Sequence, residues 1–248
     1  MIAAASVAGE ALIADFERLG EIAVVEKGPA DFVSAADLRS QRTIAETLGR
    51  AFPDIAFLGE EGGDNGAASA GRRFVVDPLD GTTNFLHGIP HFAIAIALEE
   101  DGVPVVGLVL DPSRRELFIA TRGDGAFVER PGRGRQALVV STRAGLRDAV
   151  VATGIPHRAR GDHPGYLRAL ARFMDEAGGI RRFGSAALDL AYVAAGRFDL
   201  FFESGLARWD IAAGSLLVEE AGGTVSGDII ATNGLLHGAV EGILRDPL

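Results

Sequence analysis

Short apolar runs are the feature that most constrains the fold of this chain. Residues 92–98 and 103–110 are almost entirely apolar, yet each run is far shorter than the roughly 20 residues that a membrane-spanning helix needs. Runs of this length between turn residues are typical of buried strands. Further strand-like segments, separated by glycine-containing turns, continue to about residue 140. We therefore expect a sheet in the first part of the chain.

Beyond residue 141 the pattern changes, because strand-like segments now alternate with helix-like ones. These segments are expected at 149–153, 163–177, 185–195, 198–202 and 209–221. A helix is also expected over 2–19, where acidic residues interrupt the apolar positions and no basic start suggests a signal peptide. We predict a mixed α/β (α+β) fold with sheets layered between helices. We expect a single domain, 1–248, with two lobes at 1–140 and 141–248.

Composition and charge exclude several classes of function. The chain has no cysteine, which excludes disulfides, thiolate zinc sites and cysteine nucleophiles, including those of cysteine-dependent phosphatases. With 24 basic and 34 acidic residues the net charge is −10. Such a surface repels nucleic acids unless a basic patch stands apart, and the basic segment 130–135 is short. We expect a cytoplasmic protein without a membrane or nucleic-acid partner.

The acidic residues with chemical potential lie at strand ends and turns, at Glu60 with Glu61, Asp77 with Asp80, and Asp210. The apolar strand 74–76 ends at Asp77, which places a carboxylate at the rim of the sheet. Pro78 and Gly81 favour a tight turn there, so Asp77 and Asp80 are expected to face one site. Two carboxylates that close raise each other's pKa unless a cation neutralises them. Oxygen ligands of this kind suit Mg²⁺ or Mn²⁺.

The residues after Asp80 offer a complementary anion site. Gly81, Thr82 and Thr83 are expected to begin a short helix, whose free backbone N–H groups can bind a phosphate. Metal ligands and an anion site then lie within eight residues, 77–84. The alternative is an acidic turn without a ligand, which the additional carboxylates at Glu60 and Asp210 make the weaker explanation.

These segments resemble the signatures of the inositol monophosphatase family. The similarity covers nearly the whole chain in order, at 31–37, 59–61, 77–85, 209–214, 219–223 and 231–234. The resemblance implies the layered αβαβα sandwich shared by inositol monophosphatases and fructose-1,6-bisphosphatases. It also implies a homodimer, which the residue pattern alone does not indicate.

The resemblance further implies two or three Mg²⁺ ions per site, with Mn²⁺ as an alternative. Glu60, Asp77 and the Leu79 carbonyl would hold the first ion, and Asp77, Asp80 and Asp210 the second. A third, weaker ion would lie on Glu60 and water. By the same resemblance, Thr82 is paired with Asp37 and assisted by Glu60 to orient and deprotonate a metal-activated water, with no covalent intermediate. Glu61 would stabilise the metal ligands without binding the ions directly.

The residues that the resemblance places against the substrate are Asp80, Gly81, Thr82, Gly184, Ser185, Ala186, Glu203 and Asp210. Among them, Glu203 would accept hydrogen bonds from ring hydroxyls of the alcohol. Arg208 departs from the animal enzymes of the family, and we expect it near the leaving group, where it would favour a substrate with additional negative charge.

The predicted activity is hydrolysis of a phosphate monoester, with myo-inositol 1-phosphate as the leading substrate and inhibition by lithium implied by the resemblance. The rival substrates are histidinol phosphate, fructose 1,6-bisphosphate and 3′-phosphoadenosine 5′-phosphate. A function of another class is also open, because some bacterial relatives act as regulatory binding partners of the transcription or RNA machinery.

Overall fold

The computed structural model describes residues 1–21, 24–28, 31–62, 71–156, 162–227 and 229–245. Its helices are α1 (Ile2–Phe16), α2 (Ala35–Ala51), α3 (Thr82–Leu86), α4 (His163–Glu176), α5 (Ala186–Ala194), α6 (Arg208–Glu220) and α7 (His237–Arg245). Its strands are β1 (Val24–Gly28), β2 (Asp31–Ser34), β3 (Ala56–Gly59), β4 (Arg72–Asp80), β5 (Ala93–Glu100), β6 (Val103–Asp111), β7 (Glu116–Thr121), β8 (Gly125–Arg130), β9 (Gly134–Ala137), β10 (Val150–Thr153), β11 (Gly179–Arg181), β12 (Leu200–Phe202), β13 (Thr224–Ser226) and β14 (Ile230–Thr232).

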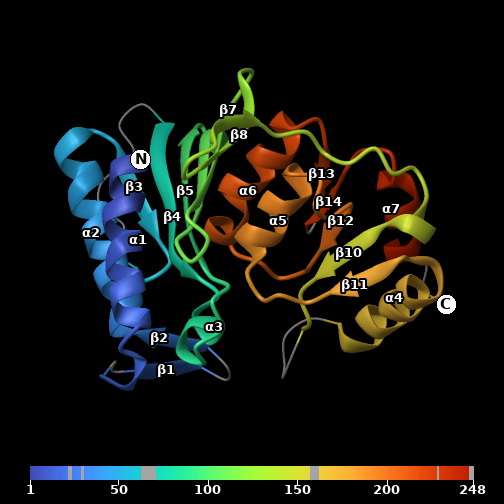
Figure 1. The fold of residues 1–248 in the computed structure, drawn as a ribbon, viewed down its shortest axis with the longest axis horizontal. Coiled ribbons are helices and arrows are strands. Elements are labelled where there is room, and N and C mark those ends of the chain that lie inside the picture. Colours follow the sequence, from blue (N-terminus) through green and yellow to red (C-terminus); the bar gives the residue numbers. More distant parts are fainter. Residues whose placement is uncertain (22–23, 29–30, 63–70, 157–161, 228, 246–248) are drawn as a thin grey trace.

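The main elements form five layers, which confirms the predicted sandwich (Figure 1). Helices α1 and α2 cover the outer face of a sheet ordered β3-β4-β5-β6-β7-β8-β9. Helices α5 and α6 lie between it and a second sheet, ordered β11-β10-β12-β14-β13. Helices α4 and α7 cover the far face of that second sheet. Among the described residues, no helix is long and apolar enough to cross a membrane.

The two apolar runs form β5 and β6, which pair antiparallel in the middle of the larger sheet. On the other side of β5, the pairing with β4 shifts between Asp77 and Asp80, which lie opposite Ala95 and Ala93. Three steps along β4 therefore match two steps along β5, which is a bulge. The structure corrects the expected tight turn at this place, because strand pairing resumes at Asp80. The bulge re-aims the carboxylates while keeping them on a rigid sheet.

The central helices are fixed by close packing against both sheets. All nine residues of α5 are buried, as expected for a helix that contacts protein on every side. Helix α6 approaches β6 so closely that a Cβ atom at Gly107 would lie 2.7 Å from the Ala213 carbonyl oxygen. This contact sets the position of α6, and its first turn carries Asp210.

Candidate active site

Acidic side chains from distant parts of the sequence meet near the ends of β3 and β4 and the start of α6. Glu60 directly follows β3, whereas Asp77 and Asp80 flank the bulge of β4. Asp210 comes from the first turn of α6, where its Oδ2 accepts a hydrogen bond of 2.6 Å from the Ala207 amide. Asp77 is 2% exposed and interacts electrostatically with Glu60, Asp80 and Asp210. The structure thus brings together all four carboxylates predicted from the sequence as metal ligands.

The pKa values of these acids are raised because their charges are buried and repel one another. Burial, followed by repulsion from the other three carboxylates, raises the pKa of Asp77 well above its usual range. Burial also raises the pKa of Asp80 to about 6, although hydrogen bonds from Ser185 and backbone amides oppose the shift. For Asp210, burial and then the charge of Asp80 raise the pKa to about 7. Among the described residues, no basic side chain lowers the pKa of Asp77, Asp80 or Asp210.

The donor set fits a divalent cation. Among the described residues, no three acidic or histidine side chains already form a ligand set around an ion. The carboxylates are nevertheless neighbours, since Asp210 is within hydrogen-bonding reach of Asp77. Buried charges of one sign need either protons or a cation, and carboxylate and carbonyl oxygens are the ligands that Mg²⁺ prefers. Glu60, Asp77, Asp80, Asp210 and the Leu79 carbonyl are the groups that could hold such an ion.

Thr82 and Asp37 lie together beside this acidic group, as the resemblance to the family implied. The Thr82 hydroxyl oxygen lies 3.0 Å from Asp37 Oδ1 and 3.0 Å from the Leu79 carbonyl oxygen, so either can accept its hydrogen. Asp37 is fully buried in the first turn of α2. Its Oδ2 accepts hydrogen bonds from the Ser34 amide and hydroxyl, which also cap the helix. Burial raises the pKa of Asp37, although these hydrogen bonds oppose the shift.

The short helix expected after Asp80 is present as α3, with Gly81 preceding it in the left-handed conformation at φ 93°. A Cβ atom at Gly81 would lie 3.1 Å from the His91 carbonyl oxygen and 3.2 Å from that of Gly184. Both the positive φ and the close approach therefore favour glycine at this position.

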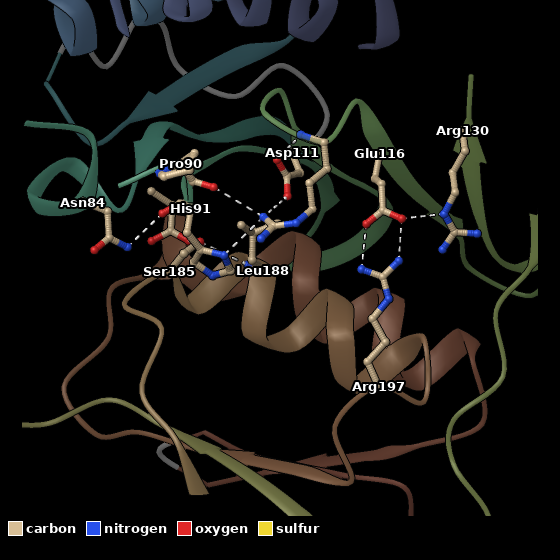
Figure 2. Close-up of polar contacts among 11 residues, drawn as sticks. Asn84, Pro90, His91, Asp111, Glu116, Arg130, Ser185, Leu188 and Arg197 are labelled. Atoms are coloured by element: carbon tan, nitrogen blue, oxygen red, sulfur yellow. Dashed lines mark hydrogen bonds and ion pairs between the residues drawn. The ribbon is translucent and has the colours of Figure 1, made fainter. Parts of the chain in front are cut away.

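Asn84 connects the acidic strand to the segment before α5. Its Nδ2 amide donates to the carbonyl oxygens of His91 at 2.8 Å, Phe183 at 2.8 Å and Gly184 at 3.3 Å. Figure 2 shows Asn84 beside His91, with Ser185 close by. The sequence showed Asn84 only as part of the motif 77–85, so its hydrogen bonds to these carbonyl oxygens were not predicted.

The segment that follows, Gly184 to Ala186, is held on Asp80. Ser185 Oγ donates to Asp80 Oδ2 at 2.6 Å, and the Ala187 amide donates to the same oxygen at 2.7 Å. Asp80 therefore lies at the N-terminus of α5, where a negative charge is favourable. The predicted substrate residues Gly184, Ser185 and Ala186 are thus brought to the acidic site.

Glu203 follows β12 and lies in the electrostatic range of the same site. Burial and then repulsion from Asp80 raise its pKa to about 7, whereas Arg182 opposes the shift. Its carboxyl group rests on the backbone of Gly154, where a Cβ atom would lie 1.8 Å from Glu203 Cδ.

Arg208 is not available for the role that we expected from the sequence. Its Nε donates to Glu99, and its Nη2 donates to the Gly102 carbonyl oxygen at 2.8 Å. Glu99 is fully buried and is also paired with Arg73 at 2.8 Å. The guanidinium of Arg208 thus neutralises a buried acid at the end of β5, which corrects the expectation of a contact with the substrate.

Two further side chains of α2 support the site and were not singled out from the sequence. Ser40 Oγ donates to the Pro78 carbonyl oxygen at 2.7 Å. Gln41 accepts a hydrogen bond of 2.9 Å from the Glu61 amide and donates to the Gly62 carbonyl oxygen at 2.8 Å. Both follow Asp37 at the i+3 and i+4 spacing of one helix face, and that periodicity is the signal that could have found them.

Comparison with known proteins agrees with this geometry. The sequence matches the inositol monophosphatase family over residues 1–234. It is 47% identical to "Inositol-1-monophosphatase" of Rhizobium meliloti over 100% of this chain and 96% of that protein. It is also 47% identical to "Nus factor SuhB" of Pseudomonas aeruginosa, over 90% of this chain and 82% of that protein. The crystal structure of extragenic suppressor protein suhB from Bartonella henselae superposes with a TM-score of 0.94 at 46% identity, covering 100% of this chain and 98% of that one.

The family match and these relatives cover the strand, helix and loop segments that carry the acidic residues. The chain therefore belongs to the inositol monophosphatase family, and this membership supports phosphatase activity.

Proposed function

We propose that this chain catalyses Mg²⁺-dependent hydrolysis of a phosphate monoester, with myo-inositol 1-phosphate as the leading substrate. The observation that carries the proposal is the meeting of the buried Asp77 with the partly buried Asp80 and Asp210, carboxylates that repel one another. The name of the Rhizobium meliloti relative, "Inositol-1-monophosphatase", supports the choice of substrate.

In this proposal Glu60, Asp77 and the Leu79 carbonyl would hold one ion, and Asp77, Asp80 and Asp210 would hold another. Asp77 belongs to both sets, because its carboxylate interacts with the other three acids. A third ion would rest on Glu60 and water, and Mn²⁺ could replace Mg²⁺. When bound, these ions supply positive charge for the phosphate oxygens and lower the pKa of water. Glu61 keeps a supporting role, since Gln41 holds its backbone.

Thr82 and Asp37 are proposed to handle the proton of the attacking water, assisted by Glu60. A Thr82 hydroxyl that donates to Asp37 keeps its lone pairs for a water hydrogen. The water proton can then pass to Thr82 Oγ1 while the Thr82 proton passes to Asp37 Oδ1. Burial raises the pKa of Asp37, which makes its carboxylate a better proton acceptor.

The remaining groups are proposed to bind the substrate. Backbone amides of Gly81 and Thr82 at α3 are suited to the phosphate, and Ser185 and Ala186, held on Asp80 at the start of α5, are proposed to lie against it. Gly184 shapes the approach to Ser185, and Glu203 accepts hydrogen bonds from the alcohol. Histidinol phosphate, fructose 1,6-bisphosphate and 3′-phosphoadenosine 5′-phosphate remain the rival substrates.

Phosphate release from these four esters tests the proposal, with Mg²⁺, with a chelator and with added lithium. We expect Mg²⁺-dependent, lithium-inhibited turnover, fastest on myo-inositol 1-phosphate. Asp80→Asn should abolish turnover while the circular dichroism spectrum stays unchanged. Turnover that persists in the chelator would refute the metal-dependent mechanism, and faster release from histidinol phosphate would replace the leading substrate.

A second function, binding to the transcription or RNA machinery, is favoured by the relatives named "Nus factor SuhB". A strain that lacks this protein separates the two functions. Complementation by Asp80→Asn would support the binding role, whereas failure of this folded variant would support catalysis. The expected homodimer is tested in the same preparations by analytical ultracentrifugation.

A further inference from the structure

Arg208 and Glu99 connect α6 to the larger sheet through an ion pair that the proposed reaction does not use. Glu99, near the end of β5, is fully buried, and its carboxylate accepts hydrogen bonds from two sides. Arg73 on the neighbouring strand β4 donates to Oε2 at 2.8 Å, and Arg208 on α6 donates to Oε1. Because Arg73 also supplies a positive charge, Arg208 does more than neutralise Glu99. It fastens the first turn of α6 to the sheet.

Arg208 also binds the turn that follows β5. Its Nη2 donates to the Gly102 carbonyl oxygen at 2.8 Å, so one guanidinium contacts both the strand and the turn. The chain directly before α6 offers less restraint, because residues 204–207 belong to neither a helix nor a strand. Ala207, at the N-cap of α6, has no polar side chain that could cap the helix. The bonds of Arg208 therefore fix the start of α6.

Asp210 moves with this first turn. Its Oδ2 accepts a hydrogen bond of 2.6 Å from the Ala207 amide, which ties the carboxylate to the backbone beside Arg208. Asp210 is also within hydrogen-bonding reach of Asp77. A displacement of the start of α6 would therefore change the distance between the carboxylates of Asp210 and Asp77.

Strand β5 is a common support for the acids of β4 and α6. Asp77 and Asp80 of β4 lie opposite residues 93–95 of β5, whereas Arg208 of α6 is bonded to Glu99 of the same strand. β5 itself is held between β4 and β6 within the larger sheet. Carboxylates from distant parts of the sequence are thus placed relative to one rigid strand.

We propose that Arg208 is a positioning residue for Asp210, and that its bond to Glu99 sets the affinity of the cation site to which Asp210 belongs. This rests on the proposed phosphatase function, in which Asp77, Asp80 and Asp210 would hold one ion. Mg²⁺ demands nearly fixed ligand positions. Residues that hold a metal ligand in place change metal affinity by about 10- to 100-fold when they are replaced.

The expected effect is specific for one ion. The other ion, which Glu60, Asp77 and the Leu79 carbonyl would hold, has no ligand on α6. Loss of Arg208 should therefore weaken one cation-binding event and spare the other. A general loosening of the fold would weaken both.

Mn²⁺ binding to the metal-free protein tests the inference without relying on turnover. Free Mn²⁺ is followed by electron paramagnetic resonance during titration of the wild type and of Arg208→Met, which keeps an apolar stem but donates no hydrogen bond. We expect one Mn²⁺ dissociation constant to rise about tenfold and the tighter remaining one to stay within about twofold. The Mg²⁺ concentration for half-maximal turnover of myo-inositol 1-phosphate should rise about tenfold, whereas kcat at saturating Mg²⁺ stays within about twofold.

Arg72→Met is the matched control, because Arg72 pairs with Glu100 at 2.8 Å on the same two strands, at the exposed surface. It should change neither Mn²⁺ binding nor turnover. Arg208→Lys keeps a positive charge opposite Glu99 and should recover most of the lost affinity. In an Asp210→Asn background, Arg208→Met should cause no further loss of Mn²⁺ affinity, because Arg208 acts through Asp210.

Wild-type affinity for every Mn²⁺ ion in Arg208→Met would overturn this inference and leave the phosphatase proposal intact. An equal rise of all Mn²⁺ dissociation constants would do the same, as would losses from Arg208→Met and Asp210→Asn that simply add. A wild-type protein that binds no Mn²⁺ and hydrolyses no ester with Mg²⁺ would overturn both proposals.

Discussion

A single side chain, Asn84, fixes the distance between the acidic strand and the N-terminus of α5. Because its amide donates to three carbonyl oxygens, Asn84→Asp would place a carboxylate oxygen against acceptors. We expect a loss of about 1–3 kcal/mol in the free energy of unfolding, measured by urea denaturation. Catalytic efficiency should fall with it, because Ser185 loses its position on Asp80. Unchanged stability in both Asn84→Asp and Asn84→Ala would contradict this role.

His91 makes the stability of the protein depend on pH. Burial, and then the charge of Arg114, lower its pKa to about 4. An unfolded histidine titrates near 6.5, so on acidification the unfolded chain takes up the proton first. The contribution of His91 is therefore complete above pH 6.5 and is lost as the pH falls toward 4.

The matching variant is His91→Gln, which does not titrate. The difference in free energy of unfolding between wild type and variant should decrease by about 2 kcal/mol from pH 7 to pH 5. Urea denaturation at both pH values measures it, and subtraction removes the contribution of the other acids. A difference that does not vary with pH would show that the ring is protonated equally in both states.

At the residue scale, the sequence predicted the acids but not their supports. Asp77 and Asp80 were recognisable because an apolar strand ends at them, and Asp210 because its segment resembles a signature of the family. Ser40 and Asn84 donate hydrogen bonds to backbone carbonyl oxygens. Because every residue has such an oxygen, the sequence does not show which one a side chain will bind. Arg208 was misread for a similar reason, since its partner Glu99 lies 109 residues away along the chain.

At the scale of elements, periodicity and length predicted several of the longer strands and helices within a residue or two, whereas short strands such as β11, β13 and β14 had no prediction of their own. The run 103–110 became β6, and the expected helix 209–221 became α6 at Arg208–Glu220. The bulge in β4 could not be predicted, because it is defined by the pairing with β5. The position of α6 likewise depends on a contact between elements, at Gly107.

That contact leads to a prediction for Gly107→Ala. The new Cβ atom would lie 2.7 Å from a backbone oxygen of α6, so the helix must move and carry Asp210 with it. We expect a destabilisation of about 1–3 kcal/mol and weaker Mg²⁺ activation of phosphate release. Gly49→Ala is the matched control, because Gly49 lies in α2 with open space around its Cβ position. This control should be neutral or slightly stabilising, and equal effects of the two substitutions would contradict the argument.

At the scale of the whole molecule, the candidate site brings carboxylates of like charge together from distant parts of the chain. Asp77 and Asp80 come from the larger sheet and Asp210 from α6, and burial raises all three pKa values. A carboxylate with a raised folded pKa stabilises the fold while it is protonated, and this contribution is lost as the pH rises through about 6 and 7 for Asp80 and Asp210. In the metal-free protein, these groups should therefore contribute less to the free energy of unfolding at pH 8 than at pH 5.5.

Divalent cations should restore this stability, because they bind the charged carboxylates. We expect Mg²⁺ to raise the melting temperature at pH 8 and to have a much smaller effect at pH 5.5. Asp77→Asn removes the charge that repels the other three acids, so it should stabilise the metal-free protein at pH 8 by about 1–4 kcal/mol. It should also abolish the response to Mg²⁺. Asp124→Asn, in an exposed turn, should keep the wild-type response. If Asp77→Asn instead destabilises the metal-free protein, the carboxylates are not in mutual repulsion, and the electrostatic reason for a cation at this site is lost.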